Sequence, residues 1–311
     1  MAKRLALTLI ALAFVIPAAA QAPRPPMCVI DMGSNTFRRI VGSFADGRYE
    51  QRAIEKRTLG VGDEVAKYGA ISDAKLAEIA DVLSRFAGSC RNEGASPIAA
   101  IGTAAFRTAP NGPQVVTAAS TLGIAMEIAT ERRESELAYL VGSLGRDGYA
   151  VVDNGSQSIE LVARDGGAPR YAVLHLGYRV AYQTFFAAAT DAKTASARFL
   201  ERLKNATANM PFMKGKRELV GIEFGEMAEI LFKAGEIEGR ILTRDELRRK
   251  LDEIAALEPN AFSALKQTKD IDRALPRLVV AVFVTEHFGY ERLVLTEREL
   301  GAGLIIEAGV K

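Results

Sequence analysis

The sequence predicts an α/β protein made of two similar domains that face each other across a cleft. The first observation is a repeat, because Asp31-Met-Gly-Ser-Asn-Thr recurs as Asp153-Asn-Gly-Ser-Gln-Ser. Each copy lies between two apolar runs and so forms a strand–loop–strand unit. The second observation is that strand-like and helix-like segments alternate in both halves. The third is length, since about 290 residues beyond the first segment suit two domains better than one core.

The first residues have the pattern of an export signal. Lys3 and Arg4 precede an apolar stretch over residues 5–16, and three alanines at 18–20 follow. This order is that of a secretory signal peptide, so we expect a signal over residues 1–20 and a leader over residues 21–27. The apolar stretch is shorter than the roughly 20 residues that span a bilayer. The expected location is the bacterial periplasm, and an uncleaved anchor or a misassigned start codon is the alternative.

The first domain is expected over residues 28–145. After the opening hairpin, Leu59-Gly-Val-Gly is a loop, and Ser72 caps a helix whose exit is bracketed by Gly88 and Gly94. The elements expected next are a strand over residues 98–101, a helix over 115–122, a strand over 124–128 and a helix over 131–144.

The second domain is expected over residues 146–311 and repeats the opening scheme. Thr243 and Glu246 form a capping box, which marks the start of a helix. The chain ends in a helix beginning near Gly303, which either stays in this domain or returns to the first. The other elements expected are strands over 150–153, 159–163, 171–176, 219–222 and 293–295, and a buried helix over 275–288.

Composition excludes several classes of function. The net charge is only +2 and charges of both signs are interspersed, so there is no basic footprint for nucleic acid. No later run is long and apolar enough for a membrane span. Two cysteines and two histidines give poor support for a zinc site. Cys28 and Cys90 are either a disulfide or two buried thiols, because sequence spacing does not decide between them.

The repeated loops favour phosphate binding. A strand that ends in Asp and turns through Gly holds a carboxylate beside several backbone N–H groups, which together form an anion-binding concavity. Two such loops across a cleft would hold a phosphate chain from both sides. Two ordinary glycine turns are the alternative, but the matching order of Asp, Gly, Ser and a polar or hydroxyl residue favours the cradle.

The chain resembles the exopolyphosphatase / guanosine pentaphosphate phosphohydrolase (Ppx/GppA) family, within the sugar kinase, Hsp70 and actin superfamily. The resemblance rests on Ile30-Asp-Met-Gly-Ser-Asn-Thr-Phe-Arg38, Leu59-Gly-Val-Gly62, residues 101–111 and Asp272-Arg-Ala-Leu-Pro276. It implies two ribonuclease-H-like (actin-like ATPase) domains and Mg²⁺-dependent hydrolysis of phosphoanhydrides. The implied partner is polyphosphate or another polyanionic phosphate substrate, and a homodimer is left open.

The resemblance and the residue types together assign roles. Asp31, Asp153 and Glu160 are the expected Mg²⁺ ligands, since Mg²⁺ prefers a few carboxylates with waters and substrate oxygens. Glu134 is the expected base, with Arg107 as a guanidinium clamp on phosphate. The expected phosphate-binding residues are Gly33, Ser34, Asn35, Arg38, Thr103, Gly155, Ser156 and Ser158.

Three of these roles have alternatives. Glu134 would otherwise lie on a charged, solvated helix face. Arg107 would otherwise be a surface arginine paired to an acid. Arg38 would otherwise only brace an Asp or Glu of the other domain.

The second half departs from the family pattern. Ser156 and Gln157 replace two glycines of the second loop, which costs about 1–3 kcal/mol if Gln157 has a positive φ. Glu223 and Glu226 put negative charge where phosphate binding needs donors, and Gly177-Tyr178 alters another turn. An exported phosphoanhydride hydrolase is the leading hypothesis. A weak or inactive anion-binding sensor is the second, and a kinase-like ATP user is the third.

Overall fold

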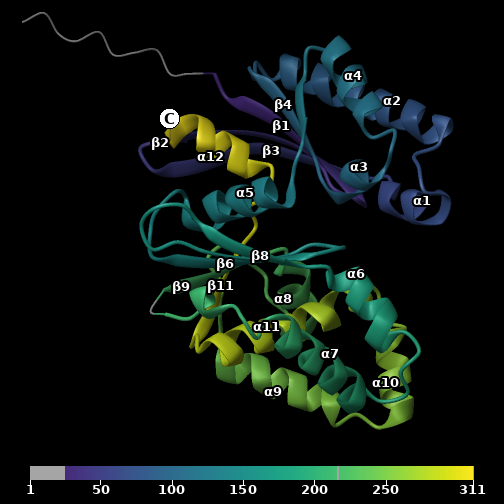
Figure 1. Cartoon of the computed structure of the whole chain (residues 1–311), viewed down its shortest axis with the longest axis vertical. Helices are drawn as coiled ribbons and strands as arrows, with labels where there is room; N and C mark the ends of the chain where they lie inside the picture. The colour runs from purple at the N-terminus through teal and green to yellow at the C-terminus, as the bar shows by residue number, and fades with distance from the viewer. Residues whose placement is uncertain (1–24, 216, 311) are drawn as a thin grey trace, which may run out of the picture.

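The protein is a stack of two β-sheets separated by two helices and covered by helices on both outer faces (Figure 1). The computed structural model describes residues 25–215 and 217–310. The expected signal peptide and residues 21–24 of the leader lie outside the described residues. The two-sheet α/β architecture matches the predicted fold class.

The first sheet has the strand order β3-β2-β1-β4-β5. Strands β1, β2 and β3 pair antiparallel, whereas β4 and β5 run parallel to β1. The strands are β1 Met27–Met32, β2 Thr36–Ala45, β3 Arg48–Thr58, β4 Ile98–Gly102 and β5 Ala125–Ile128.

Four helices cover the outer face of this sheet, and their side chains form a core with Ile30, Met32 and Phe37. Ser72 caps α2 as predicted, by accepting from Lys75 N–H. Helix α2 ends at Asn92, between Gly88 and Gly94 as predicted. One local prediction was wrong, because α1 already begins at Val61, within the expected loop. The helices are α1 Val61–Tyr68, α2 Asp73–Asn92, α3 Ala104–Thr108 and α4 Pro113–Thr121.

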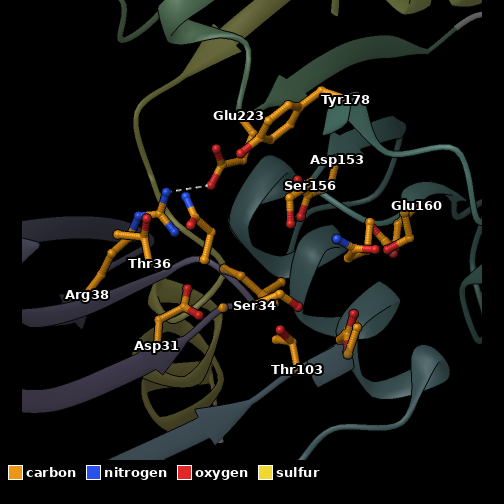
Figure 2. Close-up of a pocket in the computed structure, with 18 residues that line it drawn as sticks. Asp31, Ser34, Thr36, Arg38, Thr103, Asp153, Ser156, Glu160, Tyr178 and Glu223 are labelled. Atoms are coloured by element: carbon orange, nitrogen blue, oxygen red, sulfur yellow. Dashed lines mark hydrogen bonds and ion pairs between the residues drawn. The ribbon is translucent and has the colours of Figure 1, made fainter. Parts of the chain in front are cut away.

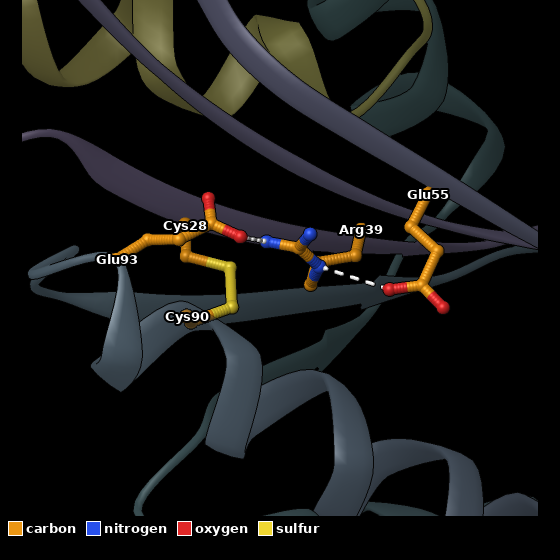
Figure 3. Close-up of a disulfide and its surroundings, with 5 residues drawn as sticks. All are labelled: Cys28, Arg39, Glu55, Cys90 and Glu93. Atoms are coloured by element: carbon orange, nitrogen blue, oxygen red, sulfur yellow. Dashed lines mark hydrogen bonds and ion pairs between the residues drawn. A yellow bond between two sulfur atoms is a disulfide. The ribbon is translucent and has the colours of Figure 1, made fainter.

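Cys28 and Cys90 form a disulfide that joins β1 to α2 (Figure 3). Both cysteines are fully buried. Beside them Arg39 of β2 donates to Glu93 at the end of α2 at 2.7 Å and lies 3.5 Å from Glu55 of β3. The helix is therefore fixed to the sheet by a covalent bond and by a buried arginine.

The second sheet has the order β10-β11-β9-β6-β7-β8. Its strands β6, β7 and β8 pair antiparallel, and β9 and β11 run parallel to β6, so it repeats the connectivity of the first sheet. The strands are β6 Tyr149–Asn154, β7 Ile159–Ala163, β8 Arg170–Leu174, β9 Glu218–Ile222, β10 Ile241–Thr243 and β11 Arg292–Thr296.

The outer face of the second sheet is covered by α11, which is buried along most of its length, and by its neighbours. The predicted capping box is present at the start of α9, between Thr243 and Glu246. The elements are α6 Tyr178–Ala181, a π-helical turn at Tyr182–Phe186, α7 Ala192–Ala206, a 3₁₀ turn at Pro211–Met213, α8 Gly225–Phe232, α9 Arg244–Ala255, α10 Pro259–Lys266 and α11 Ile271–Phe288.

The middle layer consists of α5 Glu131–Ser143 and α12 Ala302–Val310 (Figure 1). Leu137 of α5 packs with Leu304 and Ile305 of α12 against the first sheet. Tyr139 of α5 and Ala302 pack against the second sheet. The last helix thus contacts the first domain although it follows the last strand of the second. Within the described residues, no helix combines the length and apolarity that a membrane crossing requires.

Candidate active site

The two repeated loops are the tips of two β-hairpins, one in each sheet. Asp31 of β1 pairs in register with Arg38 of β2, and Asp153 of β6 pairs with Glu160 of β7. The repeat therefore places an aspartate at equivalent positions, opposite an arginine in one hairpin and a glutamate in the other.

The first loop is held by its neighbours. Ser34 accepts from Gly62 N–H through its carbonyl at 2.7 Å and from Ala105 N–H through its hydroxyl at 3.2 Å. Asn35 carbonyl accepts from Leu59 N–H at 2.8 Å. The starts of α1 and α3 are thereby joined to this loop. A Cβ on Gly62 would lie 2.9 Å from the Ser34 Cβ, which explains the glycine there.

The second loop is held by residues 177–179. The N–H groups of these residues donate to the carbonyls of Gln157, Gly155 and Ser156 at 3.0, 2.9 and 3.2 Å. Gln157 has no positive φ, so the expected backbone strain is absent. The loop instead depends on Gly177, where a Cβ would lie 2.5 Å from Gln157 backbone atoms.

The two loops line one cavity of about 100 Å³ between the domains (Figure 2). All predicted site residues except Arg107 line it. The cavity also contacts residues that carried no predicted role, namely Thr36, Ala104, Gln157, Tyr178, Glu223 and Leu300.

Asp153 and Glu160 form a buried pair of carboxylates in this cavity. Burial, with Glu160 nearby, raises the pKa of Asp153 well above its usual range. Burial, with Glu134 nearby, raises the pKa of Glu160 to about 8. Ser158 donates to Glu160 at 2.5 Å, but Asp153 Oδ1 is buried and has no hydrogen-bond partner among the described residues. Unpaired carboxylate oxygens of this kind fit a divalent cation, which would favour their ionised form.

Asp31 lies on the opposite hairpin, where its Oδ2 accepts from Gly301 N–H at 2.9 Å. Burial raises the pKa of Asp31, against the opposing effect of Arg38. Within residues 25–215 and 217–310, no three His, Cys, Asp or Glu side chains lie close enough to form a metal site by themselves. The residues therefore fit Mg²⁺ only as a site completed by waters and phosphate oxygens, which is its usual coordination.

Glu134 is buried in the first turn of α5, with an exposed fraction of 5%. It is not on a solvated face, because α5 lies between the two sheets. Burial raises the pKa of Glu134, and the ion pair with Arg107 opposes this effect. Arg107 also donates to the Ala129 carbonyl at 2.6 Å. Arg107 thus contacts Glu134 rather than the cavity.

Arg38 bridges the two domains. It lies 2.9 Å from Glu223, in the loop after β9, and 3.0 Å from Glu299, in the segment after β11. Lys56 also pairs with Glu299, at 2.9 Å. The bracing role considered for Arg38 is the one found in this structure.

The acids of the altered loop are paired. Arg277 of α11 contacts Glu223 at 3.1 Å and Glu226 at 2.8 Å, and Arg273 contacts Glu226 at 2.9 Å. Burial would raise the pKa of Glu223, but Arg38 and Arg277 outweigh it and lower the pKa to about 2. The negative charge expected from this loop is thus largely neutralised by arginines.

Comparison with known proteins gives the family. The model of the Ppx/GppA phosphatase family matches residues 42–307. The chain is 31% identical over 148 residues to the guanosine-5'-triphosphate,3'-diphosphate pyrophosphatases of Vibrio cholerae and Vibrio vulnificus. Each alignment covers 46% of this chain and 29% of the relative, so the chain spans less than a third of their length.

Solved structures show the same fold. A Ppx/GppA family member from Aquifex aeolicus superimposes with a TM-score of 0.77 at 21% identity, over 92% of this chain and 98% of that one. An exopolyphosphatase from Cytophaga hutchinsonii gives a TM-score of 0.69 at 17% identity, over 91% and 98%. From the family match over most of its length, the chain belongs to the Ppx/GppA phosphatase family.

Proposed function

We propose that the protein hydrolyses a terminal phosphoanhydride bond, with inorganic polyphosphate or a guanosine polyphosphate as substrate and Mg²⁺ as cofactor. The observation that carries the proposal is the convergence of both hairpin loops and Glu134 on one cavity between the domains. A cavity of about 100 Å³ accommodates the end of a phosphate chain. The names of the relatives, a pyrophosphatase of guanosine polyphosphate and an exopolyphosphatase, agree with this chemistry.

In the proposed reaction a water oxygen attacks the terminal phosphorus, and its proton passes to Glu134. The bond to the bridging oxygen breaks, and the products are orthophosphate and a chain shorter by one phosphate. Burial favours this role because a raised pKa makes Glu134 a stronger base. Arg107 favours the ionised carboxylate and orients it.

Asp31, Asp153 and Glu160 would hold Mg²⁺. When bound, the cation neutralises negative charge on the phosphate chain. The hairpin loops supply the hydroxyls of Ser34 and Ser156, which can donate to phosphate oxygens, whereas the Ser158 hydroxyl donates to Glu160.

The balance of charge favours a metal-dependent hydrolase over a simple anion-binding sensor. Five carboxylates line the cavity, and the only basic side chain among its lining residues is Arg38, which is already paired. Burial raises the pKa of four of these carboxylates, and a bound cation would favour their ionised form beside the phosphates. Without a cation, the lining offers a phosphate chain no free basic side chain. The five are Asp31, Glu134, Asp153, Glu160 and Glu223.

Export to the periplasm, behind a cleaved signal peptide, is also proposed. The Cys28–Cys90 disulfide supports it, because such bonds persist in oxidising compartments. N-terminal sequencing of the protein from a periplasmic fraction tests it, and a start before residue 21 in that fraction would contradict cleavage at the expected site.

The test of the hydrolase is phosphate release from tripolyphosphate and from longer polyphosphate, with Mg²⁺ and with a chelator. Glu134→Gln should lower turnover by about 10²–10⁴-fold, as expected for the loss of a general base. Glu136→Gln is the matched control, since Glu136 is two residues away and pairs with the exposed Arg132. Absence of Mg²⁺-dependent release by the wild type, with tight polyphosphate binding, would instead support the anion-binding sensor.

A further inference from the structure

Tyr178 is held rigidly against the second hairpin loop. Its backbone N–H is the middle one of the three that donate to residues 155–157. Because Gly177 admits no side chain at this contact, the start of α6 cannot shift without moving the loop. The position of the Tyr178 ring is therefore tied to that of Asp153, at the base of the same hairpin.

The ring is also fixed from behind. The guanidinium of Arg277 lies 4.1 Å from the ring centroid, a cation–π contact, and Arg277 is itself held by Glu223 and Glu226. Tyr178 is 9% exposed and lines the cavity. In Figure 2 the ring lies beside Glu223. No described residue makes a hydrogen bond with its hydroxyl, and this oxygen is not among the fully buried polar atoms, so it is open to the cavity.

The hydroxyl can serve as a donor at neutral pH. Burial raises the pKa of Tyr178, and the opposing effect of Arg277 does not reverse this. The phenol therefore keeps its proton. Phosphate oxygens accept hydrogen bonds, and a hydrogen bond to a charged oxygen is stronger than one to a neutral acceptor.

The location of Tyr178 indicates which phosphate it contacts. Its charged neighbours are Arg277, Glu223, Arg273 and Glu226, whereas those of Glu134 are Arg107, Asp31 and Glu131. The main charged neighbours of the two groups therefore differ, and Figure 2 shows Tyr178 in its upper part and Thr103, which precedes the helix of Arg107, in its lower part. In phosphoryl transfer the attacking and leaving oxygens lie roughly in line with phosphorus. With water at the Glu134 end, the leaving phosphate points toward Tyr178.

We infer that Tyr178 is a catalytic residue whose hydroxyl donates a hydrogen bond to a non-bridging oxygen of the leaving phosphate chain. This inference rests on the proposed hydrolase function. The inference assigns a function to the altered Gly177-Tyr178 turn. Its tyrosine supplies a hydrogen-bond donor in a cavity whose charged lining residues are mostly acidic.

The test compares Tyr178→Phe with Tyr182→Phe. The first removes only the cavity hydroxyl and keeps the ring on Arg277. The second removes a hydroxyl one helical turn later, outside the cavity. Tyr178→Phe should lower kcat/KM for Mg²⁺-tripolyphosphate by about tenfold, the effect of one hydrogen bond to a charged oxygen. Tyr182→Phe should leave it unchanged, and thermal melting should show both variants folded.

A binding measurement separates this inference from the hydrolase proposal. Pyrophosphate is the product left by tripolyphosphate and so retains the leaving phosphates. Titration calorimetry with Mg²⁺-pyrophosphate should show about tenfold weaker binding when Tyr178→Phe is added to Glu134→Gln. If the wild type releases no phosphate but this loss of affinity is seen, the hydrolase proposal fails and the Tyr178 contact stands. Unchanged pyrophosphate affinity overturns the contact whatever the wild-type activity.

Discussion

Reduction of the Cys28–Cys90 disulfide should lower the stability of the first domain by about 4 kcal/mol. The bond closes a loop with a sequence separation of 62 residues. Cross-linking a loop of this length removes about 14 cal/mol/K of entropy from the unfolded chain, which is about 4 kcal/mol at 25 °C. The native contacts should persist after reduction, because Arg39 and Glu93 still hold α2 on the sheet. The loss of stability is therefore expected to come from the greater entropy of the reduced unfolded chain.

The assay is urea unfolding followed by circular dichroism, with and without a reducing agent. Because both sulfurs are fully buried, the protein must be reduced in denaturant and then refolded before the titration. The double variant Cys28→Ala/Cys90→Ala is the control and should not respond to the reducing agent. Coincident unfolding curves for oxidised and reduced wild type would refute the reasoning.

Two further predictions concern the cavity. Gln157→Gly should lower phosphate release or leave it unchanged, since Gln157 has no positive φ and glycine relieves no strain; a clear gain in a phosphate-release assay would contradict this. In metal-free protein, burial raises the pKa of Glu160 from an ordinary value of 4.5 to about 8. Between these pH values the folded state therefore binds more protons than the unfolded state. The stability conferred by this proton is complete below about 4.5 and lost as pH rises through about 8. Melting temperatures in EDTA across that window should fall with pH, less steeply in Glu160→Gln.

Local signals in the sequence predicted most of the fold. The repeated Asp-x-Gly-Ser loops correctly gave two hairpins, and the Thr243–Glu246 capping box correctly gave the start of α9. Helix α2 runs past Gly88 because tertiary packing of Phe86 and Cys90 outweighs the weak helix propensity of one glycine. The disulfide and the position of α12 depend on distances between segments far apart in the chain, which periodicity does not contain.

The candidate site was predicted less completely than the fold. The hairpin residues and Glu134 line one cavity because each follows a strand end or opens a helix, positions that sequence patterns identify. The sequence analysis assigned no role to Glu299, which pairs with Arg38. Its position two residues before Gly301, whose N–H donates to Asp31, could have indicated that it lies near the site. The partners of Arg38 were not predictable, since Glu223 and Glu299 belong to the other half of the chain.

The return of α12 to the first sheet has a consequence for the order of folding. Strands β1 to β5 are complete by Ile128, yet one face of that sheet is covered in part by residues 302–310. Contacts between such distant segments carry a large loop-closure cost and form late. The domain that is synthesised first is therefore completed last. Until the C-terminal residues arrive, Val29 and Ile40 lack their α12 neighbours, and Asp31 lacks its hydrogen bond from Gly301.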